Sequence, residues 1–305
     1  MIERVLADGL AEFVARSGPP MAEVAVADLR EQVAERARGR ARGPDMDTVT
    51  DLTVAGRPAR LYRPVPGPTP LVLYLHGGGW TIGSPDTHDR VCRRLAASAQ
   101  AAVLALDYRL APEHPWPAAV EDTVAALAEI ADGPAQLQPL TSRTAVAGDS
   151  AGGTLAALAC LRLRTERPAA LPDLQVLIYA NTDLTGNSPS MQENGTGYAL
   201  TADDVRTFNR YWVPDESRWA DPAVSPLHAP DLSGLPPAFI VTAEYDPLRD
   251  EGEAYARRLT EAGVEVNLRR EPGLIHNFLM LDELSPTSRA AADRVAADLH
   301  NHLHG

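Results

Sequence analysis

From about residue 48 onward, short apolar runs alternate with stretches of helical periodicity. The run "PLVLYLH" is continuously apolar, as expected for a strand buried on both faces of a sheet, and "AAVLALDY" and "LQVLIYA" are further expected strands. Strands that alternate with helices favour a mainly parallel sheet with helices on both faces. Two further runs, "TVTDLTV" and "ARLYRP", have the alternating pattern of an antiparallel pair joined near Gly56. By length, residues 1–305 could form one large α/β domain or two small ones, and they suffice to bury a core; the family resemblance described below implies a single domain with an eight-stranded sheet.

The expected strands lie near residues 48–54, 59–64, 70–76, 101–108, 143–149, 174–180, 237–246 and 265–271. The expected helices between and after them lie near residues 118–131, 151–165, 250–262 and 286–302.

Two parts of the chain fall outside this alternation and predict an outer layer or lid. In residues 2–16 one helical face carries Ile2, Val5, Leu6, Leu10, Phe13 and Val14, and a second, charged helix is expected from about 22 to 41. Residues 184–234 are rich in Ser, Asn, Gly and Pro and contain one expected helix. That helix begins at a capping box of Thr201 and Asp204, and one of its sides carries Val205, Phe208 and Trp212. Long insertions at the carboxyl edge of a sheet are usually functional loops or lids.

A serine stands in a run of very small residues directly after a predicted strand, in "AVAGDSAGGTL". One interpretation is a tight turn in which Ser150 merely caps the following helix. The other is a nucleophile elbow, Gly-x-Ser-x-Gly, in which a strained turn exposes the serine hydroxyl. The flanking glycines would then be required because strand and helix approach too closely for side chains. The pattern alone is modest support, so it needs partners elsewhere in the chain.

A serine nucleophile requires a base, and the base requires an orienting carboxylate. His276, in "EPGLIHNFL", follows the last predicted strand and a Pro-Gly turn, although a histidine packed in a loop is the alternative. Asp246, in "AEYDPLRDEG", directly follows another strand, with a plain turn residue as the alternative and Asp250 as the rival carboxylate. The order Ser150, Asp246, His276 is the order of α/β-hydrolases, so together these residues predict a catalytic triad.

Acyl transfer by a serine nucleophile passes through a tetrahedral intermediate, whose negative oxygen must be met by preplaced N–H donors. The stretch "LHGGGW", residues 75–80, follows the third strand, where lipases and esterases carry such a loop, although it could also be merely flexible. The N–H of Ala151, at the start of the helix after Ser150, is the expected second donor, and the helix dipole favours negative charge there.

The composition excludes several classes of function. The chain contains no lysine, which rules out a Schiff base with pyridoxal phosphate, a P-loop lysine and a Ser-Lys pair. A net charge of −13 argues against nucleic acid or an anionic membrane as partner. No zinc spacing occurs, and no cofactor or metal is expected. Alternate histidines in the tail, His300, His302 and His304, predict a frayed terminal helix rather than a metal site.

Two further expectations concern the cysteines and the location of the protein. Cys92 and Cys160 lie in amphipathic stretches and are expected as buried thiols, with a disulfide left open as the alternative. The N-terminal stretch has acidic residues and no apolar core of a signal peptide, and no stretch is long and apolar enough for a membrane span. We therefore expect a cytoplasmic location.

Five segments together resemble the bacterial hormone-sensitive-lipase-like carboxylesterases (family IV) of the α/β-hydrolase superfamily. These segments, in family order, are "HGGGWTIGSPDTHD", "DYRLAPEHPWPAAVED", "GDSAGGTLAA", "TAEYDPLRDEGEAYARRL" and "PGLIHNFL". The resemblance implies an α/β-hydrolase fold, Ser150, Asp246 and His276 as the triad, and Gly78, Gly79 and Ala151 as oxyanion donors. It also implies that His76 and Gly77 support the glycine loop, that His114 is structural, and that residues 1–45 and 184–215 form a helical cap.

The resemblance leaves the substrate pocket and the substrate open. Tyr198 and Trp212 are implied to lie either above the acyl pocket or in the core of the cap. Thr154 stands where the family often has asparagine, and Asn277 stands where it often has glycine, so Asn277 could narrow or polarise the entrance. The resulting hypothesis is a cofactor-free serine carboxylesterase acting on short- to medium-chain acyl esters, with homodimers frequent in the family. The alternatives are an amidase or specialised deacylase for a secondary metabolite, which would use the same triad, and a binding protein, which would be expected to have lost a triad member.

Overall fold

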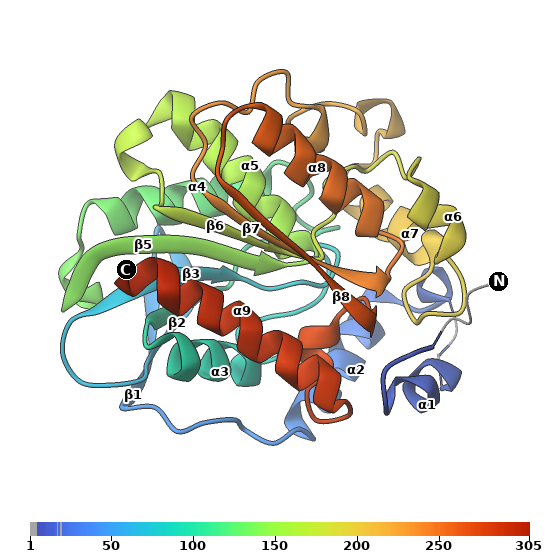
Figure 1. The fold of residues 1–305 in the computed structure, drawn as a ribbon, viewed down its shortest axis with the longest axis horizontal. Helices are drawn as coiled ribbons and strands as arrows, with labels where there is room; N and C mark the ends of the chain where they lie inside the picture. Colours follow the sequence, from blue (N-terminus) through green and yellow to red (C-terminus); the bar gives the residue numbers. More distant parts are fainter. Residues whose placement is uncertain (1–4, 17, 19) are drawn as a thin grey trace.

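A computed structural model describes residues 5–16, 18 and 20–305, and its centre is a single eight-stranded sheet (Figure 1). The strands, in the order in which they lie side by side, are β1 (Thr48–Val54), β2 (Arg57–Arg63), β4 (Ala102–Leu106), β3 (Thr69–Leu75), β5 (Leu140–Asp149), β6 (Leu174–Ile178), β7 (Ala238–Tyr245) and β8 (Val266–Ile275). β1 pairs antiparallel with β2, and β2 with β4, whereas all other neighbours are parallel. The predicted eight-stranded, mostly parallel sheet is therefore confirmed.

Helices cover both faces of the sheet, as the alternating pattern predicts (Figure 1). On one face α3 (Asp89–Ala99) and α9 (Pro286–His304) pack side by side. The opposite face carries α4 (Ala118–Ala131), α5 (Ala151–Glu166) and α8 (Arg249–Glu261). Every residue of β3, β4 and β6 is buried, which accounts for their apolar sequences. Cys92 and Cys160 are buried free thiols, in agreement with the prediction.

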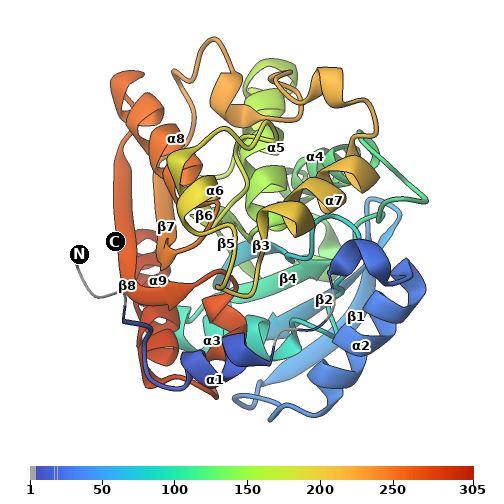
Figure 2. The ribbon, with the colours of Figure 1, turned by 90° about the vertical axis from the view of Figure 1, so that its right-hand side faces the viewer.

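Further helices lie beyond the carboxyl ends of the strands, toward the viewer in Figure 2. They are α1 (Leu10–Ala15), α2 (Val26–Arg38), α6 (Pro189–Glu193) and α7 (Ala202–Trp212). Leu29 of α2, Phe208 of α7 and Ile82 from the loop after β3 form a small buried cluster. Segments from the start and the middle of the chain therefore pack together over the loop that follows β3.

The N-terminal helices are shorter than the sequence predicts. The helix expected over 2–16 is confined to α1, because Gly9 has a φ of 84°, and Ile2 lies outside the described residues. The helix expected from 22 to 41 is α2, preceded by a short 3₁₀ turn at Met21–Glu23. Leu10 of α1 packs with the core beside α9 rather than with the cluster of Leu29 and Phe208.

The C-terminal part differs from expectation in two places. Pro272 and Gly273 lie within β8 instead of ending it, because the pairing with β7 shifts register there and Gly273 adopts a φ of 70°. The terminal helix does not fray: α9 runs to His304, with Leu303 only 3% exposed, and the rings of His300 and His304 lie against the carbonyl of Ala99. Side-chain packing of this last turn supplies the stability that the sequence pattern does not show. None of the described helices has the length and apolar character needed to cross a bilayer.

Candidate active site

Ser150 occupies a strained turn between β5 and α5. Its φ is 52° and its ψ is −121°, a combination that few residues with a side chain adopt. The turn leaves no space for side chains on either flank: a Cβ on Gly148 would lie 2.3 Å from the carbonyl carbon of Gly152, and one on Gly152 would lie 1.9 Å from the carbonyl oxygen of Leu75. The two glycines of the Gly-x-Ser-x-Gly pattern are therefore required because no larger residue fits beside the turn. The side chain of Ser150 forms no capping hydrogen bond, so the turn presents its hydroxyl rather than using it to cap the helix.

Three predicted residues from different strands are hydrogen-bonded in series. Nε2 of His276 lies 3.0 Å from Oγ of Ser150, and Nδ1 of His276 lies 2.8 Å from Oδ2 of Asp246. Ser150 follows β5, Asp246 follows β7 and His276 follows β8, so the parallel strands deliver all three to one edge of the sheet. Asp246 is fully buried and His276 is 8% exposed. Such a chain can move a proton from a hydroxyl to a ring nitrogen held in one orientation.

The rival carboxylate, Asp250, is engaged elsewhere. Its two oxygens accept hydrogen bonds from the backbone N–H of Ser190, at 2.9 Å, and from Nε of Arg249, at 2.7 Å. Asp246 uses its second oxygen, Oδ1, to accept the N–H of Leu248 at 2.8 Å, which fixes the carboxylate relative to His276. The geometry thus selects Asp246 over Asp250.

The loop after β3 carries backbone donors one and two residues after Gly77, whose N–H donates to Asp149, the neighbour of Ser150. Gly78 and Gly79 have φ values of 116° and 56°, and the carbonyl of Gly78 accepts hydrogen bonds from the N–H groups of Thr81 and Ile82, both at 3.0 Å. Within the described parts of the chain, the N–H groups of Gly78 and Gly79 have no hydrogen-bond acceptor. The N–H of Ala151, in the first turn of α5, likewise has no acceptor in its own helix. These three donors are available to a ligand oxygen.

Asp149, which sequence reasoning did not single out, supports this loop. Its carboxylate is 1% exposed, and Oδ1 accepts hydrogen bonds from the hydroxyl of Tyr74 at 2.7 Å and from the N–H of Gly77 at 2.9 Å. Burial raises the pKa of this carboxyl, but the adjacent imidazole of His88, with Nε2 3.6 Å from Oδ1, and the hydrogen bond from Tyr74 outweigh burial and keep the pKa below its usual value. The signal available in the sequence was a charged residue inside an otherwise apolar strand end.

His76 lies behind the glycine loop, in contact with the backbone rather than with Ser150. Its Nδ1 is 2.8 Å from the carbonyl oxygen of Gly77, and its ring stacks on Tyr108 with centroids 4.2 Å apart. Burial lowers the pKa of His76 to about 3, so its imidazole is neutral at ordinary pH. These contacts support the glycine loop from behind, which is the role that the resemblance implies for His76. His114 is exposed and its backbone N–H donates to the carbonyl oxygen of Leu110; its structural role stays a prediction.

The structure does not bring the three suggested pocket residues together. Trp212 is fully buried and stacks on Trp80 at 3.9 Å, within the main core. Tyr198 stacks on Tyr245 at 5.1 Å, and Asn277 is exposed with a φ of 69°. Asparagine tolerates this left-handed conformation better than most residues, which explains how it stands where glycine is frequent.

Phe208 is a better-placed neighbour of the donors and was predicted only as part of a helix face. A Cβ on Gly79 would lie 2.2 Å from a ring carbon of Phe208, so the ring rests directly on the glycine loop. Phe208 is 5% exposed. The aromatic ring therefore covers the glycine loop at Gly79.

Comparisons with known proteins agree with this arrangement. A family model described as the alpha/beta hydrolase fold matches residues 72–280. The chain is similar to carboxylic ester hydrolase LipN of Mycobacterium tuberculosis, with 45% identity over 272 residues that cover 86% of this chain and 72% of that protein. It is 37% identical over 296 residues to an ethyl acetate hydrolase of Pseudomonas putida, covering 93% of this chain and 92% of that one. Among solved structures, an esterase of Pyrobaculum calidifontis superposes with a TM-score of 0.91 and 41% identity, covering 97% of this chain and 98% of the other.

Proposed function

This chain belongs to the α/β-hydrolase family, in its hormone-sensitive-lipase-like branch, and is a carboxylic ester hydrolase; from that premise we propose that Ser150, His276 and Asp246 carry out the reaction on small esters. The observation that supports these roles is the hydrogen-bonded series Ser150 Oγ, His276 Nε2 and Nδ1, and Asp246 Oδ2, with distances of 3.0 and 2.8 Å. The base therefore lies within reach of the nucleophile's proton, and the carboxylate orients the base without taking a proton itself.

In the acylation step, Oγ of Ser150 attacks the ester carbonyl carbon while Nε2 of His276 takes the hydroxyl proton. Asp246 accepts the Nδ1–H of His276, which holds the tautomer with a free Nε2 lone pair and stabilises the imidazolium that forms. The C–O bond to the alcohol then breaks, and His276 returns the proton to the departing alkoxide. An acyl group remains on Ser150.

The negative oxygen of the tetrahedral intermediate lies toward the N–H groups of Gly78, Gly79 and Ala151. These groups are held by the backbone before substrate binds, so no reorganisation is needed as charge develops. One such donor typically contributes about 3 kcal/mol to the stabilisation of the transition state. The positive end of the α5 dipole acts in the same direction.

In the deacylation step, water replaces the alcohol. His276 takes a proton from the water, the resulting oxygen attacks the acyl carbonyl, and the same donors hold the second oxyanion. Return of the proton to Oγ of Ser150 releases the carboxylic acid and restores the starting state. No cofactor takes part in either half of this proposed sequence.

The proposed substrates are esters with short to medium acyl chains. Phe208 rests on Gly79 and so limits the space next to the donors. The similarity to an ethyl acetate hydrolase supports the short end of this range. A homodimer and a cytoplasmic location stay predictions from the sequence, to be tested by light scattering of the purified protein and by fractionation of its native cells.

The decisive experiment is hydrolysis of p-nitrophenyl esters from acetate to palmitate, with Ser150→Ala in parallel. We expect activity to peak at short to medium chains and to be lost in the variant. A folded wild type that is inert on every ester but active on amides would overturn the ester preference. Activity retained in Ser150→Ala would overturn the assignment of the nucleophile.

A further inference from the structure

An arginine-rich groove lies between α3, α9 and the segment that joins α2 to β1. Its volume is about 490 Å³, and its lining residues are Ala41, Arg42, Gly43, Pro44, Arg90, Arg94, Ser98 and Arg289. Half of these residues are arginines, although the chain carries a net charge of −13. Such a local reversal of charge concentrates anions from solution at this place on the surface.

One buried carboxylate fixes several of these arginines. Asp282, whose side chain is 1% exposed, accepts hydrogen bonds from Arg90 Nη2 and Arg94 Nη1, both at 2.7 Å, and from Arg40 Nη2 at 2.9 Å. Arg90 also donates through Nη1 to the carbonyl oxygen of Ala41 at 3.0 Å. The guanidinium groups of Arg90 and Arg94 are therefore held before a ligand arrives, so these two lose little side-chain entropy on binding.

The cationic charge of the groove region exceeds its anionic charge. Its cationic residues are Arg40, Arg42, Arg90, Arg94 and Arg289, and its anionic residues are Asp282, Glu283 and Asp293. Among the residues that the structure describes, Arg42 has no ion-pair or side-chain hydrogen-bond partner. Arg289 donates only through Nε to the carbonyl oxygen of Asp282, at 3.3 Å. Two guanidinium groups are therefore left without a carboxylate, which matches an anion of charge −2.

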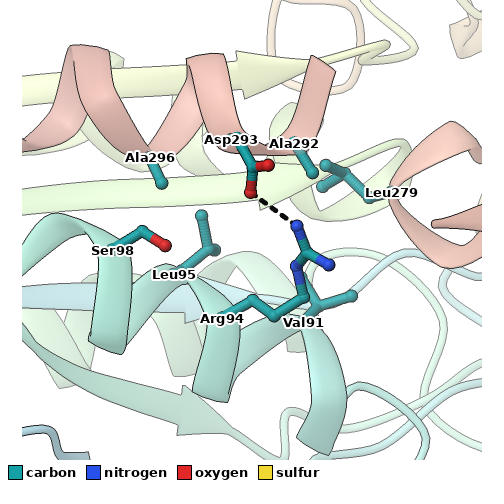
Figure 3. A pocket seen from close by; sticks show the side chains of 8 residues that line it. All are labelled: Val91, Arg94, Leu95, Ser98, Leu279, Ala292, Asp293 and Ala296. Atoms are coloured by element: carbon teal, nitrogen blue, oxygen red, sulfur yellow. Dashed lines mark hydrogen bonds and ion pairs between the residues drawn. The ribbon is translucent and has the colours of Figure 1, made fainter. Parts of the chain in front are cut away.

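Figure 3 shows the seam between α3 and α9 that adjoins this groove and shares Arg94 and Ser98 with it. Nη2 of Arg94 reaches across the seam to Oδ1 of Asp293 at 2.5 Å, and the hydroxyl of Ser98 lies farther along the same helix. The groove shares no lining residue with the triad or its oxyanion donors. A ligand bound there would be separate from the ester substrate.

We propose that this groove is a second binding site, for a soluble phosphorylated metabolite held through its phosphate group. The planar fork of a guanidinium group matches phosphate oxygens in a bidentate manner, and a phosphomonoester carries close to two negative charges at pH 7. A volume of about 490 Å³ is larger than a phosphate ion needs and lies within the range of small-molecule sites. The net charge of −13 disfavours the other source of phosphate, the headgroups of an anionic membrane.

The test is calorimetric titration of the full chain with inorganic phosphate and, separately, glycerol 3-phosphate. Ionic strength is held constant with sodium chloride in an amine buffer, because the groove is open to solvent and its attraction is screened by salt. We expect saturable binding of both probes, and at least tenfold weaker binding in the double variant Arg42→Ala/Arg289→Ala. The matched control is Arg257→Ala, which removes an exposed arginine of α8 and is expected to bind like the wild type.

A second double variant, Arg42→Gln/Arg289→Gln, keeps most of the side-chain stems and guards against a folding defect, and we expect the same loss of binding. Esterase activity of both double variants should equal that of the wild type, which shows that the active site is intact. Absence of saturable binding, or equal binding by wild type and both double variants, would overturn the proposal. So would binding only to phosphatidylcholine vesicles that contain phosphatidic acid, because that result assigns the groove to a membrane.

Discussion

The carboxylate of Asp149 accepts the backbone N–H of Gly77 at 2.9 Å, and this contact joins the nucleophile turn to the glycine loop. The two are so close that a Cβ on Gly77 would lie 2.3 Å from Oδ2 of Asp149. The hydroxyl of Tyr74 donates to the same oxygen, Oδ1, that receives the N–H of Gly77. The residue next to Ser150 therefore also sets the position of the proposed oxyanion donors.

Replacing Asp149 is expected to impair turnover more than substrate binding. In Asp149→Ala the donors of Gly77 and Tyr74 lose their acceptor in a buried place, so we expect kcat to fall about 100-fold and the unfolding free energy to drop by about 2–4 kcal/mol. Asp149→Asn keeps one oxygen for both donors and should lose less of each. Steady-state kinetics and urea unfolding measure these effects. An unchanged kcat in folded Asp149→Ala would contradict this role.

Asp246 and Asp250 form a matched pair for testing the triad. Asp246→Asn removes the charge and favours the wrong tautomer of His276, so we expect kcat to fall by about 10⁴ with little change of KM. Asp250 contacts Ser190 and Arg249 instead, and Asp250→Asn should retain kcat within a few-fold. Both are measured with p-nitrophenyl acetate. Equal losses in the two variants would refute the choice of Asp246.

The contact between Gly79 and Phe208 predicts that a side chain at position 79 lowers activity and that a smaller residue at position 208 relieves this loss. In Gly79→Ala the new methyl group would lie 2.2 Å from the ring, which must push the loop or the ring aside, so we expect kcat/KM to fall at least tenfold. Phe208→Leu in the same chain should restore part of the loss and shift the preference toward longer acyl chains.

The control for Gly79→Ala is a substitution at Gly56, which introduces backbone strain without a steric clash. Gly56 also has a positive φ, 74°, but a Cβ there would meet nothing within 4 Å. Gly56→Ala should therefore cost about 1 kcal/mol of stability and leave kcat/KM unchanged. If the double-mutant cycle of Gly79 and Phe208 shows simple additivity, the two residues are not coupled.

His76 makes stability depend on pH below neutrality. Burial lowers its folded pKa to about 3, while in the unfolded chain it keeps the ordinary value near 6.5. The unfolded state therefore binds the extra proton first, and the unfolding free energy falls as pH drops below about 6.5 until the folded pKa is reached. Between pH 7.5 and pH 5 this loss is about 2 kcal/mol.

Urea unfolding at both pH values measures this effect against two variants. His76→Gln, which does not titrate, should lose about 2 kcal/mol less than the wild type over this interval. His114→Gln, which removes an exposed histidine, should follow the wild type. Parallel curves for His76→Gln and wild type would show that His76 is not buried in its neutral form.

The sequence predicts the sheet and the three polar residues at its edge well because both depend on local patterns. Buried strands are apolar along their length, and Ser150, Asp246 and His276 each stand directly after such a strand. The lack of space for a side chain at Gly148 and Gly152 could be inferred from the pattern itself, since only glycine fits so tight a turn.

Contacts between distant parts of the chain could not be predicted. The position of Phe208 on Gly79 joins α7 to the loop after β3, and nothing in either segment alone indicates the other. Asp149 was overlooked because its role depends on Tyr74 and Gly77, some seventy positions earlier. The late start of the first helix, at Leu10, and the intact final turn of α9 likewise depend on tertiary packing rather than on periodicity.

The strand order has a consequence for how this protein fails when heated. Among the described residues, β8 is the last strand of the sheet and β7 is the one strand paired with it, yet His276 follows β8 directly. Separation of one strand pair is enough to carry the proposed base away from Ser150, while β3, β5 and β6 keep neighbours on both sides. Inactivation of the enzyme should thus precede the melting of its sheet, and cooling soon after inactivation should restore activity, because the remaining strands still provide a template for β8.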